Sequence, residues 1–150
     1  AQLIEIAMHY NVSVIAVKEV PKDMVSHYGV VAVKNQISDE LFEVSDLVEK
    51  PATNDAPSRL AIVGRYILSG HIFASLERMS PVGTQEIQLT DAIADLIRQN
   101  KRVLAYIIQG DRYDIGTPMG WFKAMITFGL TDPVLGPQLK DFLHQLTIGV

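Results

Sequence analysis

The apolar residues at the start of the chain change from helical to strand-like spacing. Over Gln2 to Tyr10 they recur every three or four positions, which predicts a helix. From Val12 to Val20 most positions are β-branched and Pro21 follows, which predicts a strand that is buried on both faces and then interrupted. Tyr28 to Val33 and Leu41 to Glu49 predict two further strands, joined as a hairpin by polar residues.

The rest of the chain alternates strands with amphipathic helices. An exposed loop over Pro51 to Pro57 precedes a predicted strand over Leu60 to Leu68, and Ser69 can cap the helix that follows. The remaining predicted elements are a helix with Ile72, Phe73 and Leu76 on one face, a helix with the stripe Ile87, Leu89, Ile93, Leu96 and Ile97, a strand over Val103 to Ile108, and helices near Met119 to Leu130 and Gln138 to Leu146. This order predicts an α/β fold with a mostly parallel or mixed sheet flanked by helices.

Composition narrows the classes of protein and of partner. The 150 residues are 48% hydrophobic and 20% charged, which suits one globular domain. The net charge is -4 and no basic run exceeds Lys101-Arg102, which argues against nucleic acid or an anionic membrane surface as a partner. No cysteine occurs, so disulfides and thiolate metal sites are excluded, and we expect a cytoplasmic protein. The apolar runs are shorter than the roughly 20 residues of a membrane-spanning helix. Because the chain opens inside a predicted helix, we expect a fragment.

The end of the predicted hairpin brings an acid and a base together. Glu49 and Lys50 close a strand, directly before Pro51, at the kind of strand end where α/β sheets bind ligands. A carboxylate accepts from two neighbouring sugar hydroxyls and an ammonium neutralises a phosphate, so this pair suits a sugar phosphate. The alternative is a solvated charge pair at a strand end.

A second candidate is the polar turn before the penultimate helix. Asp114 lies between a predicted strand and that helix, where its carboxylate is a suitable oxygen ligand for Mg²⁺. Alternatively, Asp114 or Thr117 caps the helix, with Pro118 in its first turn.

Two strand glycines allow two interpretations each. Gly29 starts a predicted strand, where either a ligand approaches the backbone or a bulge forms. Gly64 allows the same ligand approach, or it makes room for packing as a buried strand glycine. The run Glu86 to Asp91 is interpreted as an amphipathic helix start without a catalytic role. Trp121 and Phe122 are expected in the core or at a subunit contact.

Five stretches of the chain together resemble one family. They are YGVV at Tyr28 to Val31, LVEKP at Leu47 to Pro51, LAIVGRYIL at Leu60 to Leu68, EIQLTDAI at Glu86 to Ile93 and DIGTPMGW at Asp114 to Trp121. Their order and wording resemble the bacterial UTP–glucose-1-phosphate uridylyltransferases over nearly the whole chain. Other sugar nucleotidyltransferases share an EKP and a D-x-G element, but generally not VGRYIL and EIQLTDAI.

The resemblance implies a Rossmann-like nucleotidyltransferase fold, of which residues 1–150 are the C-terminal portion. It also implies a reaction in which UTP, glucose 1-phosphate and Mg²⁺ give UDP-glucose and pyrophosphate by direct in-line attack. In that family's pattern Glu49 holds glucose hydroxyls, Lys50 holds the sugar phosphate, Gly29 approaches the sugar through its backbone, Gly64 forms part of the pocket wall, and Asp114 is a metal ligand.

The sequence departs from that family's pattern in the parts that bind the nucleotide and its metal ion. Its glycine-rich GxGTR loop and first metal-binding aspartate are not in this sequence, and no two of the ten glycines have GxG spacing. This chain alone is therefore expected to be inactive. A truncated sheet would expose an edge that can pair with another copy of the chain. The family also associates through its C-terminal helices, which here correspond to residues 118–150. A homo-oligomer is therefore expected. The alternatives are a thymidylyltransferase or another sugar-1-phosphate nucleotidyltransferase, or a non-catalytic binding or oligomerisation module.

Overall fold

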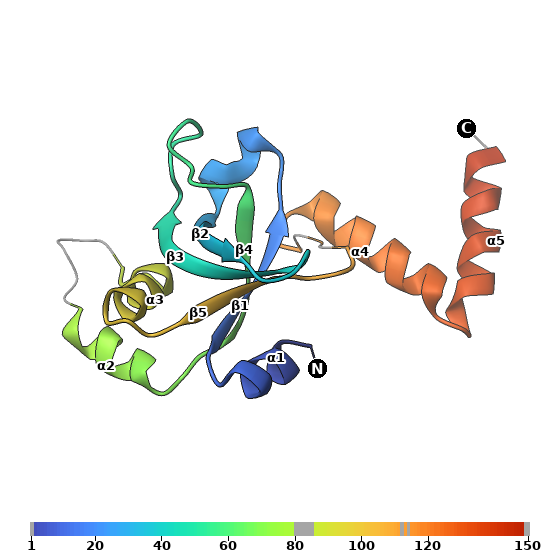
Figure 1. Ribbon diagram of the computed structural model, residues 1–150. Coiled ribbons are helices and arrows are strands. Elements are labelled where there is room, and N and C mark those ends of the chain that lie inside the picture. The colour runs from blue at the N-terminus through green and yellow to red at the C-terminus, as the bar shows by residue number, and fades with distance from the viewer. Residues whose placement is uncertain (1, 80–85, 112, 114, 149–150) are drawn as a thin grey trace. The chain divides into compact units, whose positions relative to one another are not determined.

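The computed structural model describes residues 2–79, 86–111, 113 and 115–148, in two compact units. The first unit spans Ala1–Ile108 and the second spans Gln109–Val150. The first holds helix α1 (Gln2–Tyr10), strand β1 (Ser13–Glu19), the 3-10 helix η1 (Lys22–His27), strands β2 (Gly29–Gln36), β3 (Leu41–Glu49) and β4 (Leu60–Ile67), helices α2 (His71–Arg78) and α3 (Leu89–Arg98), and strand β5 (Val103–Ile107). The second holds helices α4 (Pro118–Thr131) and α5 (Leu135–Ile148) (Figure 1).

The sheet of the first unit is mixed, as the sequence predicts. Its strands follow the order β1-β4-β2-β3-β5, and β5 pairs back onto β1 to close the ring. Among the strands that the structure describes, only β1 and β5 run parallel, and the other four pairings are antiparallel. The predicted hairpin is confirmed as β2 and β3, which pair from Gly29 with Glu49 to Gln36 with Phe42.

The expected exposed sheet edge is wrong for the strands that the structure describes. Each of these strands has a partner on both sides, because β3 pairs with β2 along most of its length and with β5 through Leu41, Phe42 and Glu43. The register shifts within β2 and within the β1–β4 pairing are bulges, which bend strands and increase their twist. That curvature allows a sheet of this size to close.

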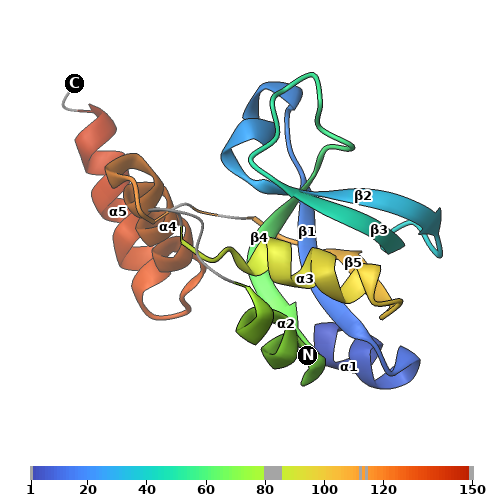
Figure 2. The same cartoon turned by 90° about the vertical axis from the view of Figure 1, so that its left-hand side faces the viewer.

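Two hydrophobic layers explain why β1 is an unbroken apolar run. Ile15 and Val17 belong to the larger core cluster, which includes Ile93 and Leu96 of α3. Val14 belongs to a smaller cluster that packs against α1. Successive strand residues point to opposite faces, so a strand covered on both sides must be apolar throughout. Figure 2 shows α2 and α3 together on one side of the strands.

Three details of the predicted helices are wrong. The helix η1 was not expected, since its six residues are too few for an apolar period. Phe73 was expected on the buried face of α2, yet it is 68% exposed. The predicted cap Ser69 is replaced by Gly70, and no side chain caps α2.

The helices of the second unit approach each other closely at two glycines. A Cβ at Gly129 would lie 2.7 Å from Leu139 Cδ2, and one at Gly136 would lie 2.7 Å from the carbonyl oxygen of Leu130. Trp121 and Phe122 are 47% and 54% exposed, so they are not core residues of this unit. No helix within the described ranges combines the length and hydropathy needed to cross a membrane.

Candidate functional site

The candidate site begins where β2 starts and β3 ends. Gly29 and Glu49 lie directly opposite each other in the antiparallel register of these strands. The next residue, Lys50, has φ +45°, and its backbone N–H donates to the carbonyl oxygen of Tyr28 at 3.1 Å. A left-handed conformation is uncommon outside glycine and costs of order 1 kcal/mol. This turn lies between Glu49, at the end of β3, and the buried Pro51, and Lys50 is exposed.

Glycine is required at position 29 because three side chains occupy the space of a Cβ. An added Cβ would lie 2.9 Å from Glu49 Oε2, 3.1 Å from Ile62 Cδ1 and 3.1 Å from Thr90 Oγ1. The predicted bulge does not explain this glycine, since the β2–β3 register is regular from Gly29 to Ala32. The close approach of other groups to the backbone explains this glycine. These groups are the side chains of Glu49, Ile62 and Thr90.

Thr90 is a site residue that the sequence interpretation missed. Its hydroxyl donates to Glu49 Oε2 at 2.7 Å, and its side chain is buried. It lies in the first turn of α3, inside the stretch EIQLTDAI to which no catalytic role was given. That stretch is part of the family resemblance, and it was the only signal available. The helix begins at Leu89, so Glu86 precedes it and only Asp91 is an acid of the first turn.

The charge of Glu49 affects the pKa of Tyr66, a residue of β4. Burial raises the pKa of the Tyr66 phenol, and the negative charge of Glu49 raises the pKa further. Both effects disfavour the tyrosinate. The phenol of Tyr66 therefore stays neutral at pH 7.

Gly64 lies on β4 between Ile62, which is near Gly29, and Tyr66, which is near Glu49. Its neighbours Ile62 and Tyr66 pair with Val17 and Ile15 of β1, so three residues of β4 bulge opposite the single Ala16. Gly64 has φ +73° and is exposed, and a Cβ there would meet nothing within 4 Å. The expectation of a buried strand glycine that makes room for packing is therefore wrong. The bulge, with its left-handed backbone, is the reason for glycine.

Asp114 lies outside the residues that the structure describes. Thr117, which follows it, accepts a hydrogen bond from the backbone N–H of Gly120 at 3.1 Å, and Pro118 is the first residue of α4. Thr117 is therefore the cap of that helix. Among the described residues there is no group of three or more His, Cys, Asp or Glu side chains that could hold a metal ion.

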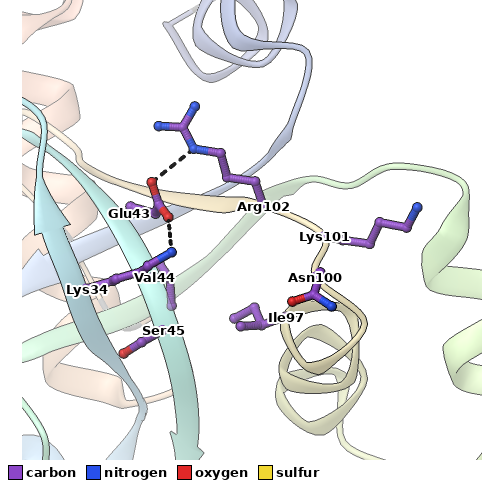
Figure 3. Close-up of a pocket in the computed structure, with 8 residues that line it drawn as sticks. All are labelled: Lys34, Glu43, Val44, Ser45, Ile97, Asn100, Lys101 and Arg102. Atoms are coloured by element: carbon purple, nitrogen blue, oxygen red, sulfur yellow. Dashed lines mark hydrogen bonds and ion pairs between the residues drawn. The ribbon is translucent and has the colours of Figure 1, made fainter.

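A separate hollow of about 380 Å³ contains none of these residues (Figure 3). In it Glu43 Oε1 accepts from Lys34 Nζ at 2.8 Å, and Glu43 Oε2 accepts from Arg102 Nε at 3.1 Å. The hydrogen bond from Lys34 holds the pKa of Glu43 below its usual value, against the effect of burial, and Arg102 adds to this. Lys101 points away from Glu43 in Figure 3, so the cations do not converge on a common ligand position.

The chain matches a family model over most of its length. The model described as "Nucleotidyl transferase" matches residues 1–128. A UTP–glucose-1-phosphate uridylyltransferase of Streptococcus pneumoniae serotype 4 is 46% identical over 145 residues, which are 97% of this chain and 48% of that protein. The chain thus spans about half the length of the curated relatives it matches.

Solved structures agree with the sequence relatives. A UTP-bound UGPase from Acinetobacter baumannii superposes with a TM-score of 0.83 at 38% identity, over 97% of this chain and 49% of that one. A UDP-glucose pyrophosphorylase complexed with UDP-glucose superposes with a TM-score of 0.77 at 38% identity, over 85% of this chain and 47% of that one.

Proposed function

This chain belongs to the nucleotidyl transferase family, and from that premise we propose that it is the C-terminal half of a UTP–glucose-1-phosphate uridylyltransferase. The observation that carries the proposal is the similarity to such an enzyme along 97% of the chain. The remaining half of the enzyme would supply the nucleotide loop, the other metal-binding aspartate and further strands. The fragment alone would be inactive.

In the proposed reaction an oxygen of the glucose 1-phosphate attacks the α-phosphorus of UTP. The new P–O bond forms UDP-glucose, and the bond from the α-phosphorus to the bridging oxygen breaks, so pyrophosphate leaves with the electron pair. No covalent bond to the protein is formed. Positioning and electrostatic stabilisation are the main contributions that such a transfer needs from protein side chains.

The residues of this chain have sugar-binding and phosphate-binding roles in the proposal. Glu49 would accept from two glucose hydroxyls, and the exposed Lys50 beside it would neutralise the sugar phosphate. Gly29 would present its backbone to the sugar, and Gly64 would form part of the pocket wall. The opposed strand ends and the left-handed turn at Lys50 support the first two roles, because they bring an acidic and a basic residue together where β2 starts and β3 ends.

Asp114 would be this chain's ligand to Mg²⁺. A magnesium ion keeps several waters and takes one or two protein carboxylates together with substrate phosphates, so a single aspartate from this half suits that chemistry. When bound, the ion would neutralise charge on the phosphates.

The second unit would serve association between copies, in a cytoplasmic homo-oligomer. Its two helices line an apolar hollow of about 410 Å³ that includes Met125, Leu139 and Phe142. Phe128 nearby on α4 is 68% exposed. Apolar surface of this extent is characteristic of protein interfaces.

Two alternatives remain distinct from this proposal. A thymidylyltransferase, or another sugar-1-phosphate nucleotidyltransferase, would use the same sugar side with a different base. A non-catalytic binding or oligomerisation module would use Glu49 only as a structural charge. The identity of 46% to a uridylyltransferase favours the first proposal over both.

The test is pyrophosphate release by the full-length polypeptide that contains this chain. We expect turnover with glucose 1-phosphate and Mg²⁺, a strong preference for UTP over dTTP, and loss of turnover in Lys50→Ala and Asp114→Ala without unfolding. Lys101→Ala is the matched control, since Lys101 is exposed and borders the separate hollow of Figure 3. Preference for dTTP would support the thymidylyltransferase, and full activity of both variants would support the non-catalytic module.

A further inference from the structure

The hydrogen bond between Thr90 and Glu49 joins residues that are distant in the sequence. The hydroxyl of Thr90 donates to one carboxylate oxygen, Oε2, at 2.7 Å, across 41 positions of the chain. Hydrogen bonds to an ionised acceptor are shorter and stronger than neutral ones. This contact therefore orients the carboxylate at the end of β3 from a different element, α3.

The donor is held firmly in place by the core. Thr90 is 7% exposed, and the residues that follow it on α3, Ala92, Ile93 and Leu96, are fully buried. A β-branched side chain also has few χ1 rotamers in a helix. The hydroxyl is consequently fixed relative to the sheet.

The backbone of Gly29 encloses the same pair of atoms. The position of its absent Cβ is 2.9 Å from Glu49 Oε2 and 3.1 Å from Thr90 Oγ1, so these atoms fill the space beside the β2 backbone. Glu49 Oε2 is thus bounded by a strand and by a helix, and its direction is set by both.

The other oxygen of Glu49 remains open. Oε1 has no hydrogen-bond partner among the described residues, and none of their buried side-chain oxygen or nitrogen atoms lacks a partner. Oε1 is therefore accessible to solvent. One oxygen of the carboxylate is anchored to the protein, and the other is available to a ligand.

We infer that Thr90 is a positioning residue, which holds Glu49 in one orientation so that its free oxygen is aligned for the hydroxyls of a sugar. This inference rests on the proposed function, because it takes the sugar-binding role of Glu49 from it. An acceptor that is oriented before binding loses less conformational freedom when the ligand arrives, and the gain appears as affinity. Thr90 itself does not touch the reacting atoms.

The test compares Thr90→Val with Thr90→Ser in the full-length polypeptide. Valine keeps the shape and removes the donor, whereas serine keeps the donor. We expect Thr90→Val to raise the KM for glucose 1-phosphate about tenfold, with the KM for UTP unchanged, and Thr90→Ser to stay near wild type. Thr131→Val, at an exposed helical threonine of α4 that donates to the carbonyl oxygen of Phe128, is the control for removal of a hydroxyl.

A second measurement does not depend on turnover. Side-chain order parameters of isotopically labelled Glu49, measured by NMR without substrate, should fall in Thr90→Val and not in Thr90→Ser. If they fall while the wild type releases no pyrophosphate, the positioning contact stands and the proposed function fails. If the wild type is active and Thr90→Val changes neither the order parameters nor the KM for glucose 1-phosphate, the inference is wrong. Equal losses in both variants would make Thr90 a packing residue only.

Discussion

At the scale of single residues, Gly29 leaves no room for a side chain beside Glu49 and Thr90. A methyl group there must displace Glu49 Oε2, Ile62 Cδ1 or Thr90 Oγ1, all within about 3 Å of its position. We expect Gly29→Ala to lower the free energy of unfolding by about 1–3 kcal/mol, as overpacked sites do. The variant should also raise the KM for glucose 1-phosphate in the full-length polypeptide, because the anchored carboxylate moves. Urea denaturation and steady-state kinetics measure the two effects.

The control for that substitution is Gly70→Ala. Gly70 has a right-handed helical backbone, and a Cβ there would meet nothing within 4 Å. Its free energy of unfolding and kinetics should match the wild type. If Gly29→Ala were as stable and as active as Gly70→Ala, the close packing around Gly29 would be refuted.

The pKa of Tyr66 depends on the charge of Glu49. Its pKa is raised first by burial and then by the nearby carboxylate, since a tyrosinate is destabilised both by loss of water and by a like charge. Glu49→Gln removes only the second cause, so the pKa of Tyr66 should fall toward its ordinary value near 10 while staying above it. Tyrosine ¹³Cζ shifts followed against pH measure this, and an unchanged or higher pKa would contradict the arrangement.

The sequence predicted that Glu49 and Lys50 lie together at the end of a strand, but it did not predict the contact between Thr90 and Glu49. Glu49 and Lys50 stand next to each other and before a proline, which is local information. Thr90 lies 41 positions from Glu49. Its contact depends on how α3 packs on the sheet, and no spacing rule encodes that.

At the scale of elements, an ion-pair network ties three segments of the sheet together. Glu43 of β3 accepts from Lys34 of β2 and from Arg102, which precedes β5. The side chains of Lys34 and Arg102 are 59% and 42% exposed, so the network contributes only about 0.5–1 kcal/mol. Glu43→Gln should lower the free energy of unfolding at pH 7 by that amount.

The pH dependence of this effect follows from the lowered pKa of Glu43. A carboxyl whose pKa is depressed in the folded state stabilises fully above its unfolded value, here near 4.5, and loses that contribution as the pH falls through the folded value. The stability difference between wild type and Glu43→Gln should therefore be constant near neutrality and shrink below about pH 4.5. Denaturation curves at several pH values measure it, and a difference that grew on acidification would contradict the sign.

Helices and strands with a clear pattern of apolar residues were predicted well. Features that depend on the pairing of distant strands were not predicted. The β-branched run of β1 specifies a strand covered on both faces, and the structure has one. The closure of β5 onto β1, and of β3 onto β5, depends on bulges such as the one at Gly64, which appears in the sequence only as a glycine inside a strand. The helix η1 is too short to leave a periodic signal.

At the scale of the whole molecule, the two units differ in how they bury apolar residues. The first unit has a continuous core that includes side chains of β1, β3 and α3. In the second, Ala124 is the buried hydrophobic side chain, and most large apolar residues of the described part of α4 and α5 are exposed. Exposed apolar surface of this kind is a common feature of sites of protein association.

Association through the second unit can be tested with two phenylalanines of equal exposure. Phe128 on α4 and Phe73 on α2 are each 68% exposed, so replacing either by glutamate should cost little within the unit that holds it. In the full-length polypeptide we expect Phe128→Glu to lower the molecular mass measured by sedimentation, because a buried interfacial charge is expensive to desolvate. Phe73→Glu should leave that mass unchanged. Unaltered helical circular dichroism would exclude unfolding as the cause, and an oligomer that survives Phe128→Glu but dissociates in Phe73→Glu would move the interface from α4 to α2.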